Sequence, residues 1–179
     1  MILSTHALVG AALANMFPSH PGVAFAAGFA SHFALDAIPH ADYPIRSASV
    51  DPTIGAPLRF DRALLHDAIT IGADGLLGLV CAFVLFASAA NQWAILLGAL
   101  GAMLPDALQF LYARFPHEPL RTLQRFHRWA HTNVDIKDRL VLAVSSQALL
   151  VVAFSAMSVM AQGGRFFGAA VAASALFTP

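Results

Sequence analysis

Long apolar runs, broken by short polar segments, dominate the chain. A membrane-spanning helix needs about 20 mostly apolar residues. The runs that approach or reach this length are residues 2–17, 22–38, 64–90, 93–113 and 140–161. The first two are marginal, because an α-helix rises only about 1.5 Å per residue. Each run is expected to form one helix.

Polar residues, prolines and glycines separate the runs. The two longest separators are 39–63 and 114–139, and the second is polar enough to carry a short surface helix over 118–132. After a break at 162–165, residues 166–177 are apolar but too short to cross a bilayer straight, so a half-helix or interfacial helix is expected there. The pattern predicts an all-α protein, one integral-membrane domain over 1–179, built as a polytopic transmembrane bundle of five to six helices.

Composition supports a membrane protein. The chain is 58% hydrophobic and 11% charged, with a mean hydropathy of +0.68, whereas a soluble domain carries about 25% charged residues. This excludes an ordinary soluble enzyme, and the high hydrophobicity excludes a disordered chain. The single Cys81 excludes a disulfide scaffold. A net charge of zero gives no basic surface for nucleic acid, so membrane lipid is the expected partner.

Basic residues indicate the orientation. Nine of the ten fall in or beside the two long loops, and only Arg165 falls elsewhere. In an up-and-down bundle both loops lie on one side, which the positive-inside rule makes cytoplasmic. The N-terminus is then cytoplasmic too.

Ionisable residues interrupt the apolar runs near that same side. Each costs roughly 2.5–3.5 kcal/mol near the bilayer centre, so they must face one another, water or a cation. His32 and Asp36 are four apart and share a helix face, as do His127 and His131. Imidazole and carboxylate suit zinc, manganese or iron, and enough donors converge for one or two ions. The residues that interrupt apolar runs are His6, His32, Asp36, Asp67, Asp74 and Asp106.

Structural explanations stand beside each of these. The His32–Asp36 pair could be a buried hydrogen bond, and Asp106 could cap a helix broken at Pro105. Thr70 and Asp74 fit polar contacts between helices. Histidines next to prolines fit solvated loops, namely His20, His40 and His117.

Three short motifs resemble the bacterial inner-membrane metal-dependent hydrolases. They are G-x-x-S-H-x-x-x-D at 28–36, L-P-D at 104–106 and H-R-x-x-H-T at 127–132, together with a histidine that opens the first apolar run. In that family the first element follows the other two, whereas here it precedes them. The resemblance implies a bacterial inner-membrane location and a divalent metal, zinc or manganese. Its ligands would be His6, His32, Asp36, Asp106, His127 and His131.

The leading hypothesis is hydrolysis at the cytoplasmic membrane surface, with a lipid-linked phosphoester as substrate. A bound metal would activate water, His66 or Asp67 would act as general base, and Arg128 would hold a phosphate. A metal-ion or proton transporter is one alternative, with Asp74 and Asp106 as its deepest groups. A non-catalytic membrane subunit with structural His/Asp pairs is the other.

Overall fold

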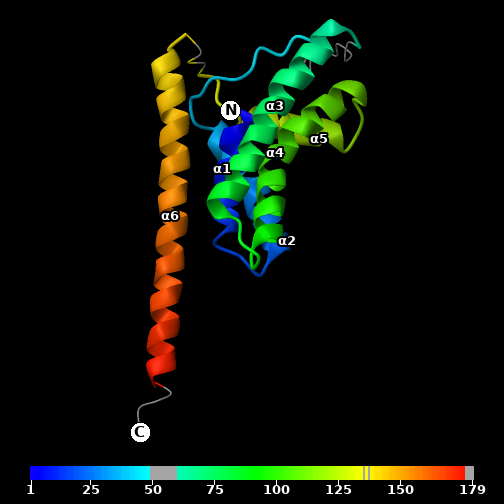
Figure 1. Ribbon diagram of the computed structural model, residues 1–179. Helices are drawn as coiled ribbons and strands as arrows, with labels where there is room; N and C mark the ends of the chain where they lie inside the picture. The colour runs from blue at the N-terminus through cyan, green and yellow to red at the C-terminus, as the bar shows by residue number, and fades with distance from the viewer. Residues whose placement is uncertain (49–59, 135, 137, 176–179) are drawn as a thin grey trace.

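Six α-helices make up the regular structure of the described residues. The computed structural model describes residues 1–48, 60–134, 136 and 138–175, without the side chains of 164–175. Within these ranges the predicted all-α class is confirmed (Figure 1). The helices are α1 (Leu3–Ala14), α2 (Pro21–Asp36), α3 (Arg62–Phe86), α4 (Gln92–Arg114), α5 (Leu120–Ala130) and α6 (Leu140–Ala175).

Three of these helices are long and apolar enough to cross a membrane: α3, α4 and α6 over Leu140–Gly163. The expected five to six crossings are not supported. With 12 and 16 residues, α1 and α2 rise only about 18 and 24 Å, short of a hydrocarbon core of about 30 Å. The turn around Pro18 shortens α1, which ends at Ala14 rather than at residue 17, whereas α2 begins at Pro21 but ends at Asp36, two residues before the expected end. Together they form a short helical hairpin.

The expected break at 162–165 is also wrong. Helix α6 continues through it to Ala175. A glycine inside a helix costs only about 1 kcal/mol relative to alanine, so Gly163 and Gly164 do not end a long apolar helix. Residues 49–59 of the predicted loop 39–63, residues 135 and 137 of the loop 114–139, and residues 176–177 of the predicted last segment lie outside the described residues.

The helices alternate in direction along the chain. In Figure 1, α1 runs down from the N-terminus, α2 returns, α3 descends and α4 rises again. Helix α5 then lies beside the upper end of α4, and α6 descends as a separate column. The N-terminus and the segments after α2 and α5 therefore gather at one end. We call this the site end. Helix α1 packs against α2, α3, α4 and α6.

Small residues let α1, α2 and α4 touch backbone to backbone. A Cβ added at Gly28 would lie 2.1 Å from the carbonyl oxygen of Gly98, and one at Gly10 would lie 2.5 Å from the same oxygen. Fully buried alanines on α1, α2, α3 and α4 fill the rest of this core. The close approach brings the upper ends of α2 and α4 together at the site end.

Helix α6 is attached by side-chain hydrogen bonds near both ends of α1. Near the site end, Gln147 Oε1 accepts from Thr5 Oγ1 at 3.1 Å and from the Ile2 N–H at 3.3 Å. At the far end, Asn15 Nδ2 donates to Ser158 Oγ at 3.0 Å, and Gln162 Nε2 donates to Asn15 Oδ1 at 2.8 Å. Most of the side chains on α6 between these contacts face outward.

Candidate metal centre

A cluster of buried histidines and aspartates lies at the site end, around Asp36. The last residue of α2, Asp36 is fully buried, as are His6 on α1 and His32 on α2. His127 Nε2 lies 3.0 Å and His32 Nε2 lies 3.1 Å from Asp36 Oδ2, while His6 Nε2 lies 3.2 Å from Asp36 Oδ1. Three helices thus direct imidazole nitrogens at one carboxylate.

Four of these residues form a first donor group: His32, Asp36, Asp106 and His127. One ligand atom from each lies within 4.8 Å of all the others. Asp106 Oδ1, on α4, is 3.6 Å from His32 Nε2 and 3.9 Å from His127 Nε2. Zinc bonds to histidine and carboxylate ligands are about 2.0–2.2 Å long, and donors this close can reach a single ion.

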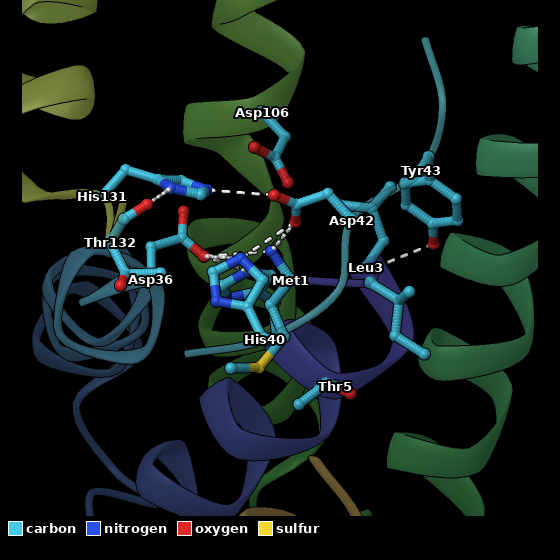
Figure 2. Close-up of polar contacts among 12 residues, drawn as sticks. Met1, Leu3, Thr5, Asp36, His40, Asp42, Tyr43, Asp106, His131 and Thr132 are labelled. Carbon is cyan, nitrogen blue, oxygen red and sulfur yellow. Dashed lines mark hydrogen bonds and ion pairs between the residues drawn. The ribbon is translucent and has the colours of Figure 1, made fainter. Parts of the chain in front are cut away.

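A second donor group shares Asp36 with the first. It consists of Asp36, His40 and His131, again within 4.8 Å of one another. Asp42 lies between its two histidines, 2.9 Å from His40 Nε2 and 3.2 Å from His131 Nε2. Figure 2 shows Asp42 pointing toward His131, His40 and the Met1 amine. Because both oxygens of Asp36 face donors, this carboxylate can bridge the two groups.

Backbone carbonyls orient three of the imidazoles. His32 Nδ1 lies 2.8 Å from the Ala102 oxygen, His40 Nδ1 lies 2.6 Å from the Ile38 oxygen and His131 Nδ1 lies 2.9 Å from the Thr132 oxygen. Since a carbonyl only accepts hydrogen bonds, each Nδ1 carries the proton. Whenever such a ring is neutral, it presents the lone pair of Nε2 to the cluster. Metal-bound histidines are held in this way.

The carboxylate of Asp106 is oriented by side chains. Gln109 Nε2 donates to Asp106 Oδ1 at 2.8 Å, and Gln124 Nε2 on α5 donates to Gln109 Oε1 at 3.1 Å. A backbone bond from the Thr132 N–H to the Asp36 carbonyl, at 2.7 Å, ties the end of α5 to the end of α2. These contacts hold the donors of four separate segments in place.

Some buried nitrogens of the cluster lack a hydrogen bond of good geometry. Among the described residues these are both ring nitrogens of His6 and Nε2 of His40. Buried polar groups in folded proteins are nearly always hydrogen-bonded. A cation bound within the cluster would satisfy the two Nε2 atoms, so the donor set fits a metal ion.

Charges at the rim of the cluster are coupled. Burial by itself would raise the pKa of Asp42, but hydrogen bonds from His131 and His40 and the nearby Met1 amine outweigh it and hold the pKa below its usual range. The hydrogen bond to Asp42 raises the pKa of His131, against the opposing effect of burial. This pair therefore favours a carboxylate facing an imidazolium when no metal is bound.

A cavity of about 530 Å³ opens beside the cluster. We call it the polar cavity. Five of the polar residues in its wall are Asp42, Asp106, His127, Arg128 and His131. A small polar group could thus approach both donor groups from outside.

The residues expected to act as catalysts lie in different surroundings. Arg128 lines the polar cavity. Asp67 accepts backbone hydrogen bonds from Arg46 at 2.9 Å and Ser47 at 2.8 Å, and so anchors the segment after α2. The His66 side chain is 48% exposed, with Nδ1 3.6 Å from Asp67 Oδ1.

Asp74, on α3, accepts hydrogen bonds from two other segments of the chain. It accepts from the Ser4 N–H at 2.8 Å, at the N-terminus of α1, and from the hydroxyl of Tyr43. A carboxylate at a helix N-terminus is stabilising. The polar-contact interpretation of Asp74 agrees with this geometry.

His40 and Asp42 were missed, because both follow α2 in an irregular segment. His32, Asp36 and His40 continue a spacing of four, but α2 ends at Asp36, so helical spacing does not place His40. His127 and His131 share that spacing, but α5 ends at Ala130 and His131 has an extended backbone. The two histidines consequently enter different donor groups.

Comparison of the chain with protein families, curated proteins and solved structures finds no match.

Proposed function

We propose that this protein is a membrane-embedded metal-dependent hydrolase that acts on a lipid-linked phosphoester at the membrane surface. The observation that supports it best is the set of histidine Nε2 atoms gathered around Asp36 and Asp42. Three of these rings have Nδ1 held by a backbone carbonyl, namely those of His32, His40 and His131. The donor chemistry suits zinc or manganese, as one or two ions. The excess of arginines at the site end favours a cytoplasmic site in a bacterial inner membrane.

The residues of the polar cavity have distinct roles in this proposal. A bound divalent ion would polarise the phosphoryl oxygen and acidify a nearby water. Arg128 would bind the phosphate through its guanidinium. Asp106, partly exposed on the cavity wall, would accept a proton from water as the water oxygen bonds to phosphorus, and would pass that proton to the ester oxygen as its bond to phosphorus breaks. Asp106 takes the base role first expected of His66 or Asp67, since neither of those is among the residues described as lining the polar cavity.

The packing of the bundle away from the site end argues against the transporter alternative. Below the cluster the described core is built from buried alanines such as Ala7, Ala11 and Ala99. Among the described residues, the next buried polar side chains of this core lie around Asn15 and Asn91, at the end opposite the site end. There, Asn91 Nδ2 donates to Asn15 Oδ1 at 2.8 Å. These two amides are hydrogen-bonded to each other, so they serve to join helices.

Metal content of the purified protein tests the proposal. We expect elemental analysis to find zinc or manganese in the wild type, and His32→Ala and His127→Ala to lose it together with phosphate release from phosphatidic acid in mixed micelles. The matched control is His20→Ala, because His20 is exposed and lies at the opposite end of the bundle. A metal-free wild type that also fails to bind added zinc or manganese would contradict the proposal and favour a non-catalytic subunit.

A further inference from the structure

An apolar groove of about 760 Å³ lies between α3 and α4. We call it the α3–α4 groove. Leu3 of α1 and Phe25 of α2 contribute to its lining. Apolar side chains supply most of its walls, among them Leu64, Ile71, Leu76, Leu100, Met103 and Leu104. Its chemistry is therefore that of a site for hydrocarbon.

The groove is open because small residues line part of it. A Cβ added at Gly72 would meet no atom within 4 Å, and Ala68 and Ala107 contribute only methyl groups from the two walls. Helix α3 packs far more extensively against α1 than against α4. The space between α3 and α4 is consequently left without side chains to fill it.

The groove and the polar cavity adjoin. Three residues line both of them: Ile71, Asp106 and Phe110. Asp106 also belongs to the first donor group. A ligand that spans the two spaces would have a polar end beside the cluster and an apolar end between α3 and α4.

Both walls of the groove belong to helices with membrane-spanning length and hydropathy. Leu76, on the α3 wall, is 63% exposed, so the groove borders the surface that the bilayer would cover. Lipid chains could enter sideways without passing through water. The groove extends from the site end toward the middle of the bundle, which is the direction that an acyl chain takes from a headgroup at the site end.

We propose that the α3–α4 groove binds an acyl chain of a membrane phospholipid, whose phosphate headgroup lies in the polar cavity beside Asp106. The placing of the headgroup rests on the proposed function, whereas the binding of the chain does not. The occupant is a lipid from the surrounding bilayer. Acyl-chain length and the width of the groove then determine which phosphoesters reach the cluster.

Photo-cross-linking tests the binding of the chain directly. The full-length protein is reconstituted into phosphatidylethanolamine vesicles that contain a phosphatidylglycerol with a diazirine in the middle of one acyl chain. Mass spectrometry of peptides should locate cross-links on groove residues such as Met103 and Leu104. Gly72→Phe or Ala107→Phe should lower these cross-links about tenfold, because the added ring would occupy the space that the acyl chain needs; a tenfold loss corresponds to about 1.4 kcal/mol.

Gly163→Phe is the matched control, because a Cβ at Gly163 on α6 also meets no atom within 4 Å. It should leave the cross-links unchanged. Cross-links on the exposed face of α6, at Val152 and Met160, report ordinary lipid contact and should be equal in all variants. The proposal is overturned if groove cross-links are no more frequent than these and do not respond to Gly72→Phe.

The same variants separate this inference from the proposed function. Groove cross-links that fall in Gly72→Phe, in a protein that neither holds metal nor releases phosphate, would support the groove and refute the hydrolase. Hydrolysis of a short, soluble alkyl phosphate that requires His32, with no specific groove cross-links, would support the hydrolase and refute the groove.

Discussion

Substituting Gly28 with alanine tests whether the close contact between α2 and α4 positions the donor cluster. The new Cβ would lie 2.1 Å from the Gly98 carbonyl oxygen and 3.0 Å from its carbonyl carbon. Such a contact requires the two helices to separate by about 1 Å, and inserting a carbon into a packed core typically costs about 1–3 kcal/mol. His32 lies one turn further along α2, so it moves with Gly28.

The consequence for the cluster follows from one distance. The His32 Nδ1–Ala102 oxygen separation is 2.8 Å, and lengthening it by about 1 Å exceeds the usual hydrogen-bond limit of about 3.2 Å. His32 would then lose the contact that orients its Nε2. Losing such a contact to a metal ligand typically lowers metal affinity by roughly 10–100-fold. We expect Gly28→Ala to lower both the thermal midpoint and the affinity for zinc.

The assay is thermal unfolding in detergent, with and without zinc, together with zinc titration against a chromophoric chelator. Gly22→Ala is the control, because it lies on the same helix and a Cβ there meets no atom within 4 Å. Equal midpoints and equal affinities for Gly28→Ala and Gly22→Ala would refute the argument that helix contact positions His32.

Two further predictions concern the acidic residues around the cluster. Asp74→Ala should lower the thermal midpoint, because the Ser4 N–H and the Tyr43 hydroxyl lose their acceptor at a cost of about 1–3 kcal/mol. The metal stoichiometry at saturation should not change. Loss of metal with an unaltered midpoint would instead make Asp74 a ligand. For the metal-free protein, the raised pKa of His131 means that its pairing with Asp42 stabilises fully below the ordinary value of 6.5 and weakens as pH rises through the raised pKa. Because the pKa of Asp42 is lowered, its carboxylate contributes to stability at every pH above 3.8. His131→Gln should therefore destabilise the protein more at about pH 6 than at about pH 8.5. An equal loss of thermal midpoint at the two pH values would contradict the pairing.

Helical spacing predicted only the part of the cluster that lies on helices. His32 and Asp36 are four apart inside α2, and the spacing alone puts them on one face. Asp106 stood out because a charged residue interrupts an apolar run. The meeting of α2 with α4 depends on backbone contacts at Gly28 and Gly98, and no local pattern specifies which helices those glycines join.

Among the described residues, three helices are long and apolar enough to cross a membrane, and the five to six crossings predicted from the apolar runs are not supported. Apolar runs predicted helices correctly, but a run can be buried by protein as well as by lipid. Buried residues such as Val9 and Leu35 face α6 in a shared apolar cluster, which a hydropathy pattern does not distinguish from contact with lipid. His40 and Asp42 depend on how the chain turns after Asp36, and sequence spacing carries little information on such turns.

The two attachments of α6 have a consequence for motion. Hydrogen bonds between transmembrane helices contribute only modestly, about 0.6 kcal/mol on average, and α6 is joined to α1 by few of them. Of the three helices of membrane-spanning length, α6 packs least against the others, so it can separate as a locally opening unit. Because Gln147 and Gln162 hold it at two heights, α6 returns in one register only. Each such opening would uncover Met1 and Leu35, next to Asp36, and admit lipid or water to the back of the cluster.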